Sequence, residues 1–356
     1  MTIRKAMPIL WRYMLVVATS CLLAFFISHE GRASTAPAPA VSSAYESAGP
    51  FQVGSVDETW DDQARKRKLP IRVLFPISAQ AENPTKFPVV VFSHGLGGSK
   101  AAGKLWGEHW ASHGYVAVHV QHPGSDESVW KDKPTAQVES SLKSAMTMSN
   151  LGLRVGDVHF VIDEIVRRSG GKDVAFKDAD SKKIGVSGHS FGAQTTLAIA
   201  GQVSPVVRGQ SGFDKRVVAA IAFSPNARNK TKMDKQFGDI RMPFFSITGT
   251  KDGAVLNDGT TIEDRTLPYI HMPSGDKYLL VLDGGDHMVF GGQTFTRRMT
   301  SPRDDEIRGD VKAASLMFWN AYLKGDNQAK QALAGKRDDS SSLLALLAAA
   351  DRYEVK

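Results

Sequence analysis

The sequence predicts an α/β domain whose central, mostly parallel sheet is flanked by helices. From Pro70 onward, short β-branched runs alternate with segments of helical character. The runs 89–92 and 279–282 are continuously apolar, as is typical of parallel strands buried on both faces. A Gly-x-Ser-x-Gly motif at 188–192 joins an expected strand to an expected helix. With 42% hydrophobic and 23% charged residues, the 356-residue chain is globular in composition, which excludes collagen-like, disordered and disulfide-scaffold classes.

Each expected strand is a short, mainly apolar run. In chain order these runs are 71–77, 88–92, 115–121, 183–186, 217–223, 243–248 and 278–282. A helix is predicted over 155–168 because apolar residues recur there at the i, i+3, i+4, i+7 spacing of one helix face. The other expected helices are 103–113, 193–202 and 304–323. Long connections separate these elements at 125–153, 225–242, 253–276 and 291–303, and long loops in such domains usually shape a site.

On this basis the chain divides into four segments. Residues 1–40 are predicted to be a signal peptide with a small-residue leader, and 41–69 a loose lead-in. The α/β domain is expected over 70–325, a length that leaves no room for a large cap domain. Residues 326–356 form a polar tail whose apolar run near its end suits a short amphipathic helix that docks on the domain.

The N-terminus has the pattern of an export signal. Arg4, Lys5 and Arg12 precede an uncharged, mostly apolar stretch at 13–28, and small residues follow. This stretch is shorter than the roughly 20 residues that a spanning helix needs. We therefore predict a periplasmic or secreted protein with no stable membrane span once the leader is removed. A retained membrane anchor, or a lipoprotein attached through Cys21, are the alternatives.

Several other classes of function are disfavoured. Cys21 is the one cysteine, so a mature chain lacks disulfides, thiolate nucleophiles and cysteine metal sites. The formal charge is +7, but no basic run is interleaved with aromatic residues, so no nucleic-acid partner is predicted. His109 and His113 have metal-ligand spacing, yet Trp110 stands where a zinc protease needs glutamate. Residues 98–104 fit a phosphate loop, but Leu105 replaces its Ser or Thr. We expect no metal and no cofactor.

Ser190 is the candidate nucleophile. It is the serine of the Gly-x-Ser-x-Gly motif, with the strand 183–186 before it and the helix 193–202 after it. A turn this tight between strand and helix accepts only glycine on either side of the serine. The serine hydroxyl is then expected to point out from the strand end, beside a helix N-terminus.

A nucleophilic serine needs a base and an acid that orients the base. His287 follows the strand 278–282, and Asp252 follows the strand 243–248. Both therefore fall in loops at the carboxyl edge of the sheet, where Ser190 also emerges. His271 is the less favoured base because it precedes its strand. Asp283 and Asp286 are less favoured acids because they are too close in sequence to His287.

Two backbone N–H groups are expected to bind the oxyanion of a tetrahedral intermediate. One is that of Phe191, and the other belongs to Leu96 or Gly95 in the loop after the strand 88–92, with Leu96 preferred. His94 in the same loop is expected to pack beneath the turn. Met288 and Trp130 are the expected substrate-binding residues. Phe191 and Phe290 also flank the catalytic loops, although Phe290 fits core packing equally well.

Four segments together resemble the α/β-hydrolase fold. They are Phe-Ser-His-Gly-Leu-Gly-Gly at 92–98, the serine motif, Gly-Thr-Lys-Asp at 249–252 and Gly-Gly-Asp-His at 284–287. More narrowly, residues 70–325 resemble bacterial serine esterases of the dienelactone-hydrolase-like and platelet-activating-factor-acetylhydrolase-like group, which includes polyester hydrolases; His-Pro-Gly-Ser-Asp at 122–126 shares this resemblance.

The resemblance implies ester hydrolysis through an acyl-enzyme, without a cofactor. Dienelactone hydrolases proper use cysteine where this chain has Ser190, so their substrate does not carry over. The acetylhydrolases place their acid after the preceding strand, where this chain has Asn226, so phospholipid specificity does not carry over either. We expect an exported carboxylesterase-like enzyme acting on small-molecule or polymeric esters with short acyl groups. A lipase or phospholipid acyl hydrolase, a peptidase of the same fold, and a non-catalytic binding protein are the alternatives.

Overall fold

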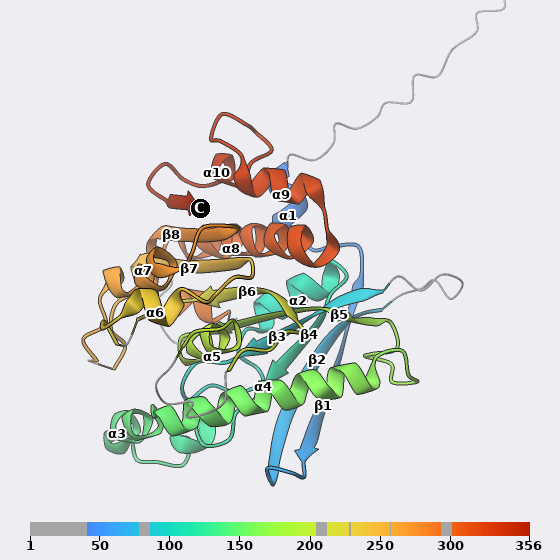
Figure 1. The fold of residues 1–356 in the computed structure, drawn as a ribbon, viewed down its shortest axis with the longest axis vertical. Helices are drawn as coiled ribbons and strands as arrows, with labels where there is room; N and C mark the ends of the chain where they lie inside the picture. The colour runs from blue at the N-terminus through green and yellow to red at the C-terminus, as the bar shows by residue number, and fades with distance from the viewer. Residues whose placement is uncertain (1–40, 78–85, 204–211, 228, 257, 293–300) are drawn as a thin grey trace, which may run out of the picture. The chain divides into compact units, whose positions relative to one another are not determined.

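A sheet of nine strands runs through the residues that the structure, a computed structural model, describes: 41–77, 86–203, 212–227, 229–256, 258–292 and 301–356 (Figure 1). The strand order is β1-β2-β4-β3-β5-β6-β7-β8-β9. The bounds are β1 Gln52–Asp62, β2 Arg67–Ile77, β3 Phe87–Ser93, β4 Val116–Val120, β5 Ala179–His189, β6 Val217–Phe223, β7 Phe244–Lys251, β8 Lys277–Asp286 and β9 Arg352–Val355. Strands β4, β3, β5, β6, β7 and β8 are parallel neighbours, while β1, β2 and β9 pair antiparallel at the edges. The predicted fold class, with its mostly parallel sheet, is confirmed.

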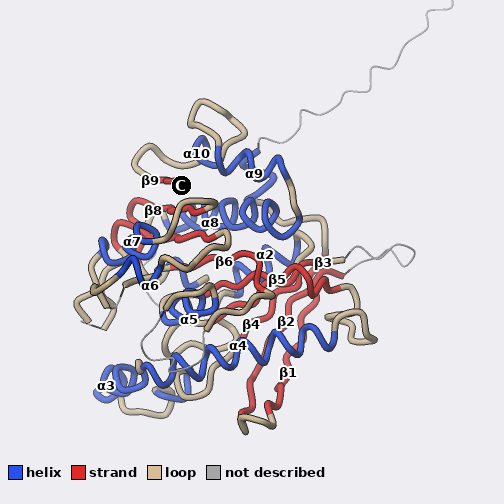
Figure 2. Tube along the Cα trace, viewed as in Figure 1, coloured by secondary structure: helices blue, strands red, loops and turns tan. Residues whose placement is uncertain are grey.

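Helices cover both faces of this sheet (Figure 2). Their bounds are α1 Val41–Glu46, α2 Lys104–Ser112, α3 Thr135–Ala145, α4 Met148–Arg168, α5 Phe191–Ile199, α6 Met233–Phe237, α7 Ile262–His271, α8 Asp304–Trp319, α9 Asn327–Ala334 and α10 Leu343–Leu346. Short 3-10 turns at Glu127–Val129 and Val289–Gly291, and a π-helical turn at Asn320–Lys324, complete the described elements.

The two faces of the sheet form two apolar cores. Successive side chains of a strand point to opposite faces, and β3 divides accordingly. Val89 and Val91 join the core under α4 and α5, while Val90 and Phe92 join the core under α2 and α8. Because both faces are buried, β3 and β4 are buried throughout and mainly apolar, which is why the sequence predicted them.

The expectation of a loose lead-in at 41–69 was wrong. That segment carries α1, the edge strand β1 and the start of β2, and β1 pairs with β2 from Gln52 to Asp62. Its side chains alternate between exposed and partly buried positions and include several acids. Because β1 lies at the edge of the sheet with one face in solvent, it has no continuous apolar run, and its sequence therefore resembles that of a polar loop.

Three further segments differ from expectation. The tail 326–356 contains α9 and α10 as well as β9, a short strand that extends the sheet beside β8. The connection 125–153 contains α3 and the first turn of α4. The connection 253–276 contains α7, whose start is marked by a capping box between Thr261 and Asp264. The export signal of residues 1–40 and Cys21 lie outside the described residues. Within the described part, no helix has the length and apolarity of a bilayer span.

Asp310 on α8 gives the fold a testable pH dependence. Its side chain is buried, and its Oδ2 has no hydrogen-bond partner among the described residues. Burial, and then the charges of Asp351, Glu306 and Glu46, raise the pKa of Asp310 from 3.8 to about 7, against the opposing charge of Arg303. The folded chain therefore holds this proton more tightly than the unfolded chain does, so this carboxyl lowers stability as pH rises from about 4 to about 7.

Asp310→Asn is expected to remove this loss. Relative to the unsubstituted chain, its free energy of unfolding should rise by about 1–3 kcal/mol on going from pH 5 to pH 8. Urea titration at the two pH values measures this difference. If the two chains differ in free energy of unfolding by the same amount at both pH values, Asp310 is not the source of the pH dependence.

Candidate active site

Ser190 occupies a strained turn between β5 and α5. Its backbone has φ 57° and ψ −113°, a conformation that costs a non-glycine residue on the order of 1–3 kcal/mol and is concentrated at functional sites. The Ser190 N–H donates to the carbonyl of Phe223 at 2.9 Å. This bond ties the turn to the end of β6, the next strand of the sheet.

The glycines on either side of Ser190 are required by close backbone packing. A Cβ atom on Gly192 would collide with the carbonyl oxygen of Ser93, and one on Gly188 would collide with the carbonyl of Gly192. The end of β3 and the start of α5 can therefore approach each other only if these positions lack side chains. The two glycines of the motif are therefore required by close contacts among β3, β5 and α5.

His287 and Asp252 meet as the strand-end argument predicted. His287 follows β8, Asp252 follows β7, and the Nδ1 of His287 donates to the Oδ1 of Asp252 at 2.7 Å. The other carboxylate oxygen of Asp252 accepts a hydrogen bond from Thr248 at 2.7 Å. A proton on Nδ1 leaves Nε2 as the basic nitrogen of the ring.

The carboxylate of Asp252 stays ionised although it is fully buried. Burial by itself would raise its pKa, but the hydrogen bond and charge of His287, together with the charge of Arg265, lower the pKa of Asp252 to about 2. The site therefore holds an imidazole ring against a permanent negative charge over the neutral pH range.

Arg265, which the sequence analysis did not single out, lies behind this pair. It projects from α7, and its Nε is 3.2 Å from Oδ1 of Asp252 and 3.0 Å from the backbone carbonyl of the same residue. Its Nη1 donates to the carbonyl of Ser224 at 3.0 Å, and its Nη2 to that of Gly253 at 3.2 Å. Arg265 thus holds the loops after β6 and β7 together. No local motif marks it, because α7 lies in a segment expected to be irregular.

His189, the second residue of the serine motif, supports His287 from the other side. Its Nε2 donates to the backbone carbonyl of His287 at 2.8 Å, and the two rings lie 4.6 Å apart. Burial, followed by the charge of His287, lowers the pKa of His189 to about 3. His189 is therefore neutral and acts as a hydrogen-bond donor.

A cavity of about 310 Å³ opens beside these residues. Its lining includes each of the predicted site residues except Asp252, namely Ser190, His287, Leu96, Phe191, Met288 and Trp130. Asp252 is buried behind His287, as an orienting acid would be. Asn226 also lines the cavity and accepts a hydrogen bond from Gln194 at 2.7 Å. Phe290 packs in the core between the sheet and α8.

The loop after β3 presents candidate oxyanion donors to this cavity. Leu96 and Gly95 both line it, and neither N–H has a hydrogen-bond acceptor among the described residues. The turn is closed by the N–H of Gly98, which donates to the carbonyl of Gly95 at 3.1 Å. Phe191 is the first residue of α5, so its N–H has no acceptor within the helix.

His94 packs under this turn, as expected. Its Nε2 accepts the backbone N–H of His122 at 3.0 Å, which places the ring proton on Nδ1. That Nδ1 donates to the carbonyl of Gly95 at 2.6 Å. Burial, then the charges of Arg154 and His122, lower the pKa of His94 well below its usual value. The ring is therefore neutral and serves as a support for the turn.

Comparison with known proteins identifies similar chains. A family model described as platelet-activating factor acetylhydrolase, isoform II, matches residues 78–168. The chain is 24% identical over 274 residues to a platelet-activating factor acetylhydrolase of Canis lupus familiaris, covering 67% of this chain and 57% of that relative. It is 27% identical over 284 residues to the protein of the same name from Bos taurus, covering 69% of this chain and 59% of that relative.

The chain thus spans less than two thirds of the length of these curated relatives. The family match covers the loop after β3 and α4, while the sheet order and the turn at Ser190 come from the structure. Together they show an α/β-hydrolase fold and a similarity to the platelet-activating factor acetylhydrolases.

Proposed function

We propose that the chain is a serine ester hydrolase that acts through an acyl-enzyme. The observation that carries this proposal is the shared cavity, in which the strained Ser190 and the base His287 lie together while Asp252 holds Nδ1 of His287 at 2.7 Å. A nucleophile, a base and an orienting acid in this chain order are the requirements for acyl transfer in this fold.

The proposed reaction has two halves. The Oγ of Ser190 attacks the ester carbonyl carbon while Nε2 of His287 takes the hydroxyl proton, and the carbonyl oxygen becomes an oxyanion held by the N–H groups of Leu96 and Phe191. The intermediate collapses, the alcohol leaves with the proton from His287, and an acyl-serine remains. A water molecule activated by His287 then releases the acid and restores Ser190. Besides the ester and the water molecule, these steps use only groups of this chain.

Asp252 stabilises the imidazolium that forms in each half-reaction, because its carboxylate stays negative next to the ring. Arg265 and His189 act as positioning residues, since each holds the backbone of the loop that carries a reacting or orienting group. The exported location, the division of the chain into leader and domain, and the ester class remain parts of this proposal.

The shape of the site favours esters with a short acyl group. The cavity is small, and its walls combine apolar side chains from the loop after β3, the segment around α3, the loop after β7 and the loop after β8; these include Leu96, Trp130, Leu142, Val255 and Met288. Trp130 is held at the cavity wall by a hydrogen bond from its indole N–H to the carbonyl of Gly97 at 2.7 Å. We assign Trp130 and Met288 to substrate binding.

A second, more polar cavity of about 350 Å³ adjoins the first. It shares Met146, Asn226 and Asp258 with the first cavity and is also lined by Lys230 and Asp264, whose side chains are ion-paired at 2.7 Å. We assign this extension to a polar alcohol portion of the ester. The names of the curated relatives make a phospholipid with a short acyl chain the second candidate substrate.

A series of p-nitrophenyl esters from acetyl to dodecanoyl tests the proposal. The value of kcat/KM should fall by about tenfold or more between the shortest and longest esters, because the cavity cannot enclose a long acyl chain. A glycerophospholipid with an acetyl group at its second position, compared with a palmitoyl analogue, tests the second candidate in the same way. A rate that rises with chain length would indicate a lipase. Ligand binding by a folded chain without any turnover would indicate a binding protein.

A further inference from the structure

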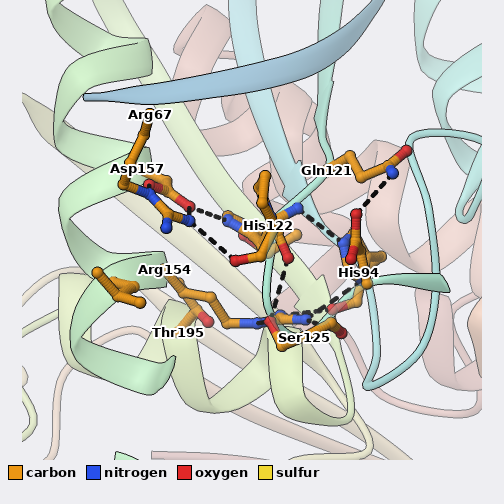
Figure 3. Close-up of polar contacts among 12 residues, drawn as sticks. Arg67, His94, Gln121, His122, Ser125, Arg154, Asp157 and Thr195 are labelled. Atoms are coloured by element: carbon orange, nitrogen blue, oxygen red, sulfur yellow. Dashed lines mark hydrogen bonds and ion pairs between the residues drawn. The ribbon is translucent and has the colours of Figure 1, made fainter. Parts of the chain in front are cut away.

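Arg154, a fully buried arginine on α4, donates hydrogen bonds to the backbone beneath the proposed oxyanion site (Figure 3). Its Nη1 donates to the carbonyl of His94 at 2.7 Å, and its Nε donates to the hydroxyl of Ser125 at 2.8 Å. Its Nη2 lies 3.4 Å from the carbonyls of both Gly95 and Ser125, and 3.2 Å from Nδ1 of His94. The guanidinium thus joins α4 to the loop after β3 and to the segment after β4.

This arrangement is unusual for a buried charge. The hydrogen-bond acceptors of Arg154 among the described residues are carbonyl and hydroxyl oxygens, whereas a buried guanidinium is normally paired with a carboxylate. Burial lowers the pKa of Arg154 to about 9, although the charges of Asp157 and Asp126 oppose this. The group remains charged at neutral pH, at a cost in folding free energy that an apolar residue of similar size would avoid.

The carbonyl of Gly95 connects Arg154 to the reaction. Gly95 C=O and Leu96 N–H belong to one planar peptide unit and point in opposite directions. The carbonyl is held from below by Nδ1 of His94 at 2.6 Å and by Arg154 at 3.4 Å. Holding the oxygen in place therefore aims the Leu96 N–H away from these groups, toward the cavity that Leu96 lines.

The side chain of Phe191, the residue that carries the second proposed oxyanion donor, is in contact with the same guanidinium. The Cζ of Arg154 lies 4.5 Å from the centre of the Phe191 ring, a cation–π geometry. Arg154 is thus in contact with residues on both sides of the oxyanion site, the loop of Leu96 and the first residue of α5.

A second set of hydrogen bonds, around Asp157 and His122, fixes the tautomer of His94 on which this arrangement depends. Asp157, one turn beyond Arg154 on α4, accepts hydrogen bonds from Arg67 at 2.8 Å and from His122 at 3.0 Å. His122 in turn donates its backbone N–H to Nε2 of His94, which keeps the ring proton of His94 directed at Gly95. Figure 3 shows both sets of hydrogen bonds, with Arg67, Asp157 and His122 on one side of the cluster.

We propose that Arg154 is a positioning residue for the oxyanion hole, which aligns the Leu96 peptide and the Phe191 ring without contacting substrate. This inference rests on the proposed ester hydrolysis. It predicts that loss of the guanidinium weakens transition-state binding more than substrate binding, because a misaligned N–H is most costly when the carbonyl oxygen carries negative charge.

The test compares Arg154→Met and Arg154→Lys with the unsubstituted full chain. We expect kcat on p-nitrophenyl acetate to fall about 10- to 100-fold in Arg154→Met, with KM changed by no more than about threefold, and an intermediate loss in Arg154→Lys. Affinity for a trifluoromethyl ketone, which forms a tetrahedral adduct with the serine, should weaken by the same factor as kcat/KM. The pH profile should keep its shape, since His287 and Asp252 are not altered.

Arg168 provides the matched control because it lies at the far end of the same helix. Its guanidinium also lies 4.5 Å from an aromatic centre, that of Trp60, and it is ion-paired with Glu58 at 2.6 Å, outside the cavity lining. Arg168→Met should lower thermal stability but leave kcat/KM within about twofold. Equal losses of activity in Arg154→Met and Arg168→Met would overturn the proposal, and so would normal inhibitor affinity in Arg154→Met.

Ser125→Ala keeps the test decisive if Arg154→Met does not fold. It removes one acceptor of Arg154 without deleting the charge, and a loss of about two- to fivefold in both kcat/KM and inhibitor affinity is expected. Unchanged inhibitor affinity in both Ser125→Ala and Arg154→Lys would overturn the inference. Failure of the proposed function is distinguishable, because the unsubstituted chain would then show neither turnover nor covalent labelling of Ser190.

Discussion

Replacing Ser190 with alanine is expected to lower kcat for short ester hydrolysis by about 10⁴-fold or more. The substitution removes only the hydroxyl oxygen that forms the acyl-enzyme. Alanine keeps the Cβ atom that the strained turn already accommodates, and the N–H of residue 190 can still donate to Phe223. The fold should therefore persist, and the loss can be assigned to chemistry.

Kinetics on p-nitrophenyl acetate, together with labelling by a fluorophosphonate and mass analysis of the labelled peptide, measures this effect. Ser187→Ala is the matched control, because Ser187 is a buried serine on β5, the strand before the turn, and does not line the cavity. It should retain both activity and labelling. Residual activity above about one per cent in Ser190→Ala, or a label on another residue, would show that Ser190 is not the nucleophile.

Asp252→Asn should have the next largest effect, a fall in kcat of about 10³- to 10⁴-fold. Asparagine has nearly the same size but carries no negative charge, so it neither stabilises the imidazolium of His287 nor enforces a proton on Nδ1. It would also leave Arg265 buried beside a neutral group. Because the pKa of Asp252 is about 2, the unsubstituted chain keeps its carboxylate above about pH 4, and the deficit of the variant should extend over the neutral range.

The pH dependence of kcat/KM between pH 5 and 9 measures this effect. Asp283→Asn is the control, since Asp283 is the nearby acid that the sequence analysis disfavoured because it is too close in sequence to His287. Its side chain is half-exposed and accepts a hydrogen bond from Thr250 at 2.9 Å. It should change kcat by less than about threefold. A larger loss of kcat in Asp283→Asn than in Asp252→Asn would contradict the proposal, because Asp283 would then be the acid that orients His287.

The sequence by itself was sufficient for features that are local. Buried parallel strands are continuous apolar runs, and the turn at Ser190 needs glycine on both sides, so the parallel part of the sheet and the position of the proposed nucleophile could be predicted directly. The positions of Asp252 and His287 also followed from sequence, because parallel strands bring the loops after their carboxyl ends to one edge of the sheet. The structure then brought these two side chains within hydrogen-bond distance.

Only the tertiary structure decided the edges of the sheet and the supports of the site. Strands β1 and β9 have partly solvated side chains, so they lack the apolar signal of the central strands. Arg154 falls on the buried face of α4, between Leu151 and Val155, where sequence offers a charged residue no visible partner. Its role is defined by carbonyl oxygens of residues 94, 95 and 125, and that of Arg265 by carbonyls after β6 and β7. Backbone acceptors leave no pattern in residue type, so the convergence of distant segments on one guanidinium becomes visible only once the chain is folded.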